Sequence, residues 1–179
     1  MKTKKVLILH GYEGSDYPHW QDWLAKKLVK LHYEVRFSTL PNKNCPILDE
    51  WLSYLEKELQ AFEPDIVVGH SLGNILWFHA LQKLDVKDID KLVLVAPVRK
   101  NCDIKEIKTF FPYKIPKSLR AKQSLLIVSN NDQYINLEEA NELKKALDIN
   151  MIVLENAGHI NPKSGYTKLD EVLQYIIEK

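Results

Sequence analysis

Ser71 lies between two glycines in the segment Gly69-His70-Ser71-Leu72-Gly73, a pattern that can support nucleophilic catalysis. An apolar run precedes this segment and apolar residues at helical spacing follow it, so we expect the serine at a turn from a strand into a helix. Such a turn exposes the hydroxyl near the positive end of the helix dipole, and its tight path favours glycine on either side. A chance match in an ordinary turn is the alternative, and the strand-to-helix context disfavours it. The motif therefore predicts a nucleophilic serine.

His159 is the candidate base for this serine, because a serine hydroxyl is a weak nucleophile until its proton is removed. It follows an Ala-Gly pair at the end of an apolar run, and α/β folds assemble their sites at the carboxyl ends of strands. Among the other histidines, His70 occupies the variable position of the serine motif. His19 is expected to cap or pack at the start of the first helix, and the alternative is that it reaches the site from the first loop. The alternative for His159 is a loop histidine with a purely structural role.

Asp132 is the candidate carboxylate that orients the histidine. It is the only acid between the fifth expected strand and the helix after it, since Glu138 and Glu139 belong to the first turn of that helix. An aspartate that only closes the turn is the alternative. The order Ser71, Asp132, His159 agrees with the order nucleophile, acid, base of the α/β-hydrolases, which supports the three assignments together.

Two backbone amides are expected to form an oxyanion hole, those of Leu72 and Tyr12. Leu72 follows the nucleophile, and Tyr12 lies in the loop after the first strand, where His10 and Gly11 are also expected to contact substrate. Glycine at position 11 would let the backbone approach the developing oxyanion. A phosphate-binding loop is the competing interpretation, but neither G-x-G-x-x-G nor Gly-Lys-Ser/Thr is present.

The elements that must position these residues alternate between short apolar runs and longer amphipathic stretches. The expected strands are Lys5–His10, Glu34–Ser38, Asp65–Gly69, Lys91–Ala96, Ser124–Ser129 and Asn150–Leu154. The expected helices lie over Trp20–Leu31, Leu48–Phe62, Ile75–Leu84, Leu137–Leu147 and Tyr166–Ile177. This alternation predicts an α/β fold in three layers, with a mostly parallel six-stranded sheet between helices. Because no repeat or linker interrupts it, residues 1–179 are expected to form a single domain.

One long segment, residues 97–122, interrupts the alternation. It contains the aromatic and proline-rich stretch "FFPYKIPKSL", and a loop of this length in a compact domain is usually functional or poorly ordered. Phe110, Phe111 and Tyr113 are therefore expected to form a small lid over an acyl pocket. The alternative is that they fill the edge of the core beneath the loop.

The composition limits the partners. The net charge is +1 with no basic stripe, so nucleic acid is not expected as a partner. No apolar run is long enough for a signal peptide or a membrane span, so we expect a cytoplasmic protein without a membrane partner. The two cysteines, Cys45 and Cys102, lack metal-type spacing and are expected to be unpaired thiols. Neither a metal nor an organic cofactor is expected, and we expect a monomer or a weak homodimer.

Four stretches in one order, "HGYEGSDYPHWQDWL", "GHSLG", "SNNDQYIN" and "NAGHIN", make the chain similar to the small serine hydrolase family typified by YdeN and retinoblastoma-binding protein nine. The resemblance implies a compact α/β-hydrolase that lacks the first two strands of larger members, with strand order 2-1-3-4-5-6. It places the family's triad on Ser71, Asp132 and His159. Asn136 departs from the proline that many hydrolases have after the acid loop.

The resemblance also implies esterase-like or amidase-like activity. We therefore expect a serine hydrolase, carboxylesterase-like, that cleaves a small ester, amide or thioester through an acyl-enzyme on Ser71. Binding to the retinoblastoma protein is not expected, because a Leu-x-Cys-x-Glu pattern is absent around both cysteines. The alternative is a protein that keeps the hydrolase fold and binds a partner without turnover, since fold alone does not settle function.

Overall fold

The computed structural model describes residues 3–178 and contains a six-stranded sheet in the order β2-β1-β3-β4-β5-β6. All neighbouring strands are parallel. The strands are β1 Lys5–Leu9, β2 Glu34–Arg36, β3 Ile66–His70, β4 Ile89–Val95, β5 Ala121–Ser129 and β6 Asn150–Leu154. The α-helices are α1 Trp20–Lys30, α2 Leu48–Phe62, α3 Leu72–Lys83, α4 Leu137–Leu147 and α5 Asp170–Ile177. The fold class and the strand order expected from the sequence are thus confirmed.

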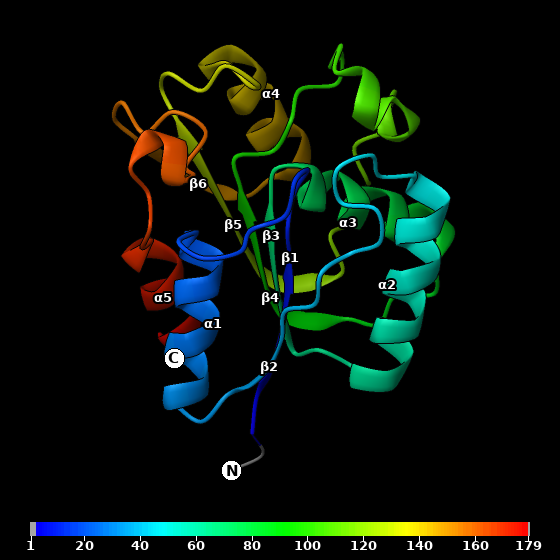
Figure 1. Cartoon of the computed structure of the whole chain (residues 1–179), viewed down its shortest axis with the longest axis vertical. Coiled ribbons are helices and arrows are strands. Elements are labelled where there is room, and N and C mark those ends of the chain that lie inside the picture. The colour runs from blue at the N-terminus through cyan, green and yellow to red at the C-terminus, as the bar shows by residue number, and fades with distance from the viewer. Residues whose placement is uncertain (1–2, 179) are drawn as a thin grey trace.

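Helices cover both faces of the sheet, and each face has its own hydrophobic core (Figure 1). The core on one face is shared with α2, α3 and α4, and the core on the other is shared with α1 and α5. Successive residues of a strand point to opposite faces, so Val67 packs in the first core and Val68 in the second. Both faces must be apolar for this reason, which explains why the strands appear as continuous apolar runs.

Some elements begin at other residues than the sequence indicated. β4 and β5 begin earlier, at Ile89 and Ala121, which pair with each other in the sheet. Their first residues include charged and amide side chains that the apolar pattern did not reveal. α5 begins at Asp170 and not at Tyr166, because a 3-10 turn, η2 (Pro162–Ser164), precedes it and ends at Gly165 with φ of 90°.

Residues 97–122 are anchored to the core by their aromatic side chains. They contain one 3-10 helix, η1 (Lys105–Phe110), and Phe110 is fully buried with its ring 5.2 Å from that of Trp51. Tyr113 is buried too, and its hydroxyl donates a hydrogen bond to the carbonyl of Val98 at 2.8 Å. The structure thus places Phe110 in the core beneath the segment. Movement of the segment as a lid stays a prediction.

Because every strand is parallel, all six carboxyl ends meet at one edge of the sheet. The loop with Tyr12 follows β1, and Ser71 follows β3 directly. Asp132 follows β5, and His159 follows β6. The topology therefore gathers residues from four distant parts of the sequence at one edge.

Candidate active site

Ser71 connects β3 to α3 with a backbone conformation that few residues adopt, at φ 53° and ψ −122°. The carbonyl of Val95, the last residue of β4, accepts two hydrogen bonds that hold this turn. One comes from the Ser71 amide at 3.0 Å and the other from the side-chain amide of Asn74 at 2.8 Å. The neighbouring strand therefore stabilises the strained turn expected from the glycine-flanked motif.

Two glycines are required here because backbone segments approach closely. A Cβ atom on Gly73 would lie 2.5 Å from the carbonyl oxygen of Leu9, at the end of β1. A Cβ atom on Gly11 would lie 2.8 Å from the Cβ of Ser71. The loop after β1 therefore passes directly beside the serine, and a side chain at either glycine would push the two apart.

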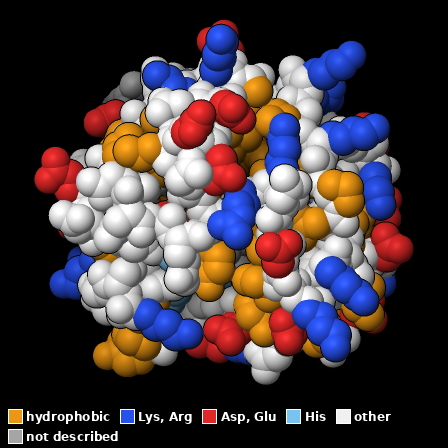
Figure 2. All heavy atoms as spheres, turned by 90° about the horizontal axis from the view of Figure 1, so that it is seen from above, with side chains coloured by type: hydrophobic (Ala, Val, Ile, Leu, Met, Phe, Trp, Pro, Cys, Tyr) orange, Lys and Arg blue, Asp and Glu red, His pale blue; other side chains and the backbone are white. Residues whose placement is uncertain are grey.

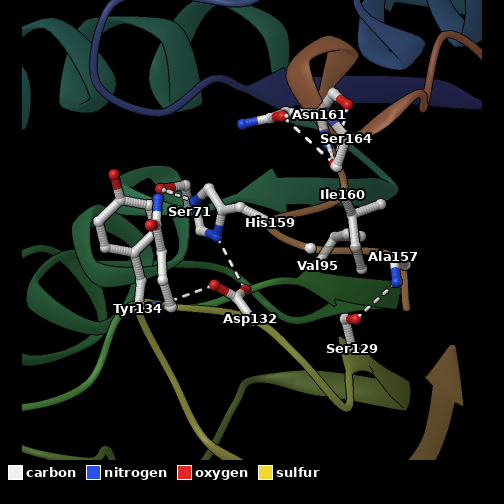
Figure 3. A network of polar contacts seen from close by, with 12 residues as sticks. Ser71, Val95, Ser129, Asp132, Tyr134, Ala157, His159, Ile160, Asn161 and Ser164 are labelled. Carbon is white, nitrogen blue, oxygen red and sulfur yellow. Dashed lines mark hydrogen bonds and ion pairs between the residues drawn. The ribbon is translucent and has the colours of Figure 1, made fainter. Parts of the chain in front are cut away.

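The structure brings Ser71, His159 and Asp132 into one hydrogen-bonded chain (Figure 3). His159 Nε2 lies 2.8 Å from Ser71 Oγ, and His159 Nδ1 lies 2.8 Å from Asp132 Oδ2. A carboxylate only accepts, so Nδ1 carries the proton and Nε2 is free to accept the serine proton. All three residues are at most 9% exposed. This geometry is suited to proton transfer from the serine hydroxyl.

The loops that carry Asp132 and His159 are joined residue by residue. Side chains of the four consecutive residues 129–132 each bond to one of the four consecutive residues 156–159. Besides the Asp132–His159 pair, Asn130 accepts from the amide of Asn156 (2.7 Å), Ser129 from that of Ala157 (2.9 Å) and Asn131 from that of Gly158 (2.7 Å). Asp132 Oδ1 also accepts from the Tyr134 amide at 2.8 Å. These bonds fix the carboxylate and the imidazole relative to each other.

His70 was expected only to fill the variable position of the serine motif, but it makes a specific contact. Its Nε2 donates a hydrogen bond to the backbone carbonyl of His159 at 3.0 Å. The ring is 4% exposed and lies against the rings of His19 and His159, with centroids 4.9 and 5.1 Å away. Burial holds the pKa of His70 well below its ordinary value, so the ring is neutral at pH 7. His70 thereby joins the serine turn to the histidine loop.

His19 begins α1, where its Nδ1 accepts a hydrogen bond from the amide of Gln21 at 3.1 Å. This confirms its expected role as a helix cap. Burial, assisted by the positive charge that His159 and His10 can carry, lowers the pKa of His19 to about 4. The ring is therefore neutral at pH 7, with its proton on Nε2.

Tyr134 is a further residue that the sequence did not single out. Its ring lies 4.5 Å from that of His159 in an edge-to-face arrangement. Its carbonyl accepts a hydrogen bond from the amide of Arg99 at 2.9 Å, which fixes the loop. The face of an aromatic ring attracts a positive charge, so a tyrosine ring that presents its face to an imidazole can stabilise the imidazolium form.

The loop after β1 is held by His10. His10 Nε2 accepts from the amide of Leu40 at 2.7 Å, so the proton is on Nδ1, which donates to the carbonyl of Gly11 at 2.7 Å. His10 is 2% exposed, so its ring supports the loop from the interior of the protein. Among residues 3–178, the amides of Tyr12 and Leu72 have no hydrogen-bond acceptor. Both are therefore free to bind a ligand oxygen.

A cavity of about 580 Å³ opens over Ser71 and His159. Tyr12 and His19 line it, whereas His10, Gly11, Phe110 and Phe111 are not among the lining residues. From the long segment, the isoleucines at 104 and 107 form its wall instead of the two phenylalanines. Figure 2 views this edge of the molecule from above and shows charged side chains of both signs interspersed over it.

Within residues 3–178, no helix is both long and apolar enough to cross a membrane. In the same part of the chain, no group of three or more His, Cys, Asp or Glu side chains is arranged to hold a metal ion.

The chain is similar to known proteins over nearly its whole length. A model of the family described as serine hydrolase matches residues 6–178. YdeN of Bacillus subtilis is 29% identical over 175 residues, 93% of this chain and 91% of YdeN. The YdeN crystal structure matches with a TM-score of 0.88 at 26% identity, over 97% of both chains. Serine hydrolase RBBP9 of Rattus norvegicus is 23% identical over 163 residues, 87% of this chain and 86% of that protein.

A more distant protein shares the fold. The esterase domain of a Rhodothermus marinus protein matches with a TM-score of 0.67 at 18% identity, over 97% of this chain and 85% of that one.

Proposed function

Since the chain belongs to the serine hydrolase family, we propose that it hydrolyses a small ester through a covalent acyl-enzyme on Ser71. The observation that carries this proposal is the hydrogen-bonded chain from Ser71 through His159 to Asp132, opening into a cavity. We propose an ester and not an amide or thioester as the substrate, because the chain shares its fold with an esterase domain. The proposed reaction is therefore carboxylesterase-like. The reaction as proposed uses no metal or organic cofactor.

In the proposed first step, His159 Nε2 takes the hydroxyl proton as Ser71 Oγ attacks the ester carbonyl carbon. Asp132 stays ionised and stabilises the imidazolium through Nδ1. The tetrahedral intermediate collapses, the bond to the leaving alcohol breaks, and His159 gives its proton to the departing oxygen. A water molecule then repeats the sequence on the acyl-enzyme, releasing the acid and restoring the serine.

The amides of Tyr12 and Leu72 are proposed as the oxyanion hole. Both lack a protein acceptor in the part of the chain that the structure describes, and the close approach of Gly11 to Ser71 places the loop of Tyr12 beside the reacting oxygen. Each such donor is worth roughly 3 to 4 kcal/mol of transition-state stabilisation. The bond from His10 to the Gly11 carbonyl keeps this loop in place before substrate binds.

The proposal is tested by trapping the acyl-enzyme. Wild-type protein is mixed with p-nitrophenyl butyrate, quenched in acid and analysed by intact-mass and peptide mass spectrometry. We expect the mass of one butyryl group on the peptide that contains Ser71, and a burst of p-nitrophenol. Turnover with the label on another residue, or no turnover by folded protein, would contradict the proposal and favour a binding role.

A further inference from the structure

The cavity over Ser71 has two chemically different walls. The wall on the side of α2, α3 and α4 is apolar: Val98 and Ile107 belong to that core, and Ile104, Tyr12 and Tyr134 pack against it. The wall on the side of α1 and α5 is polar and includes Ser15, His19, Asn161 and Ser164. In Figure 1, η2 (orange) lies above α1 and α5, while η1 (green) lies on the side of α2 and α3. A substrate seated here meets both kinds of surface.

The proposed reaction decides which part of the substrate meets which wall. The carbonyl oxygen must lie at the amides of Tyr12 and Leu72, and the leaving oxygen must lie within reach of His159 Nε2, which protonates it. His159 belongs to the loop that continues into Asn161 and Ser164. The leaving group therefore faces the polar wall, and the acyl group is left with the apolar wall.

Two polar groups on the polar wall, the buried hydroxyl of Ser15 and the ring N–H of His19, have no hydrogen-bond partner among residues 3–178. Ser15 is 3% exposed and its Oγ makes no hydrogen bond in the described residues. His19 is 5% exposed, and its Nδ1 accepts from the Gln21 amide, so the proton is on Nε2. This N–H has no acceptor among residues 3–178. The buried Ser15 hydroxyl without a partner costs free energy, and His19 lines the cavity with an unused ring N–H, so both groups are poised to bind polar atoms of a ligand.

The charges around this wall occur in opposite pairs. Glu13 lies 3.9 Å from Lys163, and Asp16 lies 2.5 Å from Lys43. Burial keeps His19 neutral at pH 7, since its pKa is lowered to about 4. The wall therefore offers hydrogen bonds without an excess of either charge, which suits a neutral polar group more than an anion or a cation.

We propose that the leaving group of the substrate is a neutral, hydroxylated alcohol, such as a polyol or sugar, bound by His19 Nε2 and Ser15 Oγ, while a short apolar acyl group packs on Ile104 and Ile107. This inference rests on the proposed function. It assigns leaving-group selectivity to His19 and Ser15, which play no part in the chemical step itself.

The test uses two esters that differ only in two hydroxyl groups, propyl butyrate and 2,3-dihydroxypropyl butyrate, in competition in one vessel. The ratio of their kcat/KM values is independent of the fraction of active enzyme. Two neutral hydrogen bonds predict that the wild type prefers the dihydroxypropyl ester by about tenfold or more.

Two variants test whether His19 and Ser15 cause the preference for the dihydroxypropyl ester. His19→Ser keeps a side chain that caps α1 but removes the ring N–H, and it is expected to lower the ratio by about threefold or more, which is the share of one of the two hydrogen bonds. Ser15→Ala removes a hydroxyl that makes no hydrogen bond within residues 3–178, so it is expected to lower the ratio without lowering the melting temperature. The matched control is His32→Asn, at an exposed histidine beyond α1, which is expected to keep the wild-type ratio.

Equal kcat/KM for the two esters in the wild type, or an unchanged preference in His19→Ser, would overturn the leaving-group inference and leave the hydrolase function standing. Labelling of Ser71 by a fluorophosphonate without turnover of either ester would overturn it as well. Absence of both labelling and turnover would remove the proposed function itself, so the two failures are distinguishable.

Discussion

His70 Nε2 donates a hydrogen bond to the carbonyl of His159 at 3.0 Å, while the side chain of His159 bonds to Ser71, the residue next to His70. Two adjacent residues of the serine turn thus hold the same histidine, one by its backbone and one by its ring. Because His70 is 4% exposed, this contact is shielded from water. Burial also lowers the pKa of His70, so the ring is neutral at pH 7. The contact fixes the position of the proposed base relative to the proposed nucleophile.

Removing this contact is expected to slow catalysis without weakening substrate binding. His70→Ala should lower kcat by roughly ten- to a hundredfold, because a small displacement of a base is enough for such a loss, and should leave KM nearly unchanged. His70→Gln, which supplies an amide N–H at similar reach, should recover part of kcat. Steady-state kinetics on p-nitrophenyl butyrate measure both. Equal kcat values for the alanine variant and the wild type would show that the contact does not position the base.

The bonds between the loops of Asp132 and His159 are expected to contribute to stability. Ser129 is 1% exposed, and its Oγ accepts from the buried amide of Ala157. Ser129→Ala leaves that amide unsatisfied and should lower the free energy of unfolding by about 1 to 3 kcal/mol. Ser53→Ala, at an exposed position of α2, should change it by no more than about 0.5 kcal/mol. Urea unfolding of both variants makes the comparison, and equal stabilities would contradict this role of Ser129.

The neutral, buried His19 predicts that the protein loses stability in acid. Its pKa is lowered to about 4 in the folded state, against about 6.5 in an unfolded chain. Between these values the unfolded state binds a proton that the folded state does not, so the free energy of unfolding falls as the pH falls. The slope from this residue is about 1.4 kcal/mol per pH unit.

His19→Ser removes this titration and should therefore flatten the dependence of stability on pH. Urea unfolding of the wild type and the variant at pH 7, 6, 5 and 4.5 measures both slopes. We expect the two curves to converge as the pH falls. Unfolded wild type takes up a proton on His19, which lowers its free energy of unfolding, whereas the variant has no such group. Parallel curves would mean that His19 is not held neutral by the fold.

Much of the fold was predictable from the sequence because the strands are covered on both faces. Short continuous apolar runs such as that around Val67 and Val68, bounded by turn residues, are typical of such strands. The order of the strands came from the family resemblance, since periodicity alone does not say which strands are neighbours. The shift of the start of α5 reflects the turn at Gly165, whose left-handed conformation no apolar pattern announces.

The site was predictable where one residue type and its neighbours suffice, as for Ser71 between its glycines. It was not predictable where long-range packing decides. The bond from His70 joins residues 89 positions apart, and no local pattern indicates it. The sequence is equally compatible with Phe110 as part of a lid and as part of the core, and only its packing on Trp51 distinguishes the two. The isoleucines that line the cavity in its place carry no chemical signature.

Labelling with a fluorophosphonate probe is the most direct test of Ser71 as the nucleophile, because such a probe reacts with activated serines and does not require the natural substrate. Wild type, Ser71→Ala and His159→Ala are compared by gel fluorescence, with circular dichroism to show that each is folded. We expect strong labelling of the wild type, none of Ser71→Ala, and a loss of at least about a hundredfold in the labelling rate of His159→Ala. Undiminished labelling of folded Ser71→Ala, or a folded wild type that does not label, would contradict the role of Ser71 as the nucleophile.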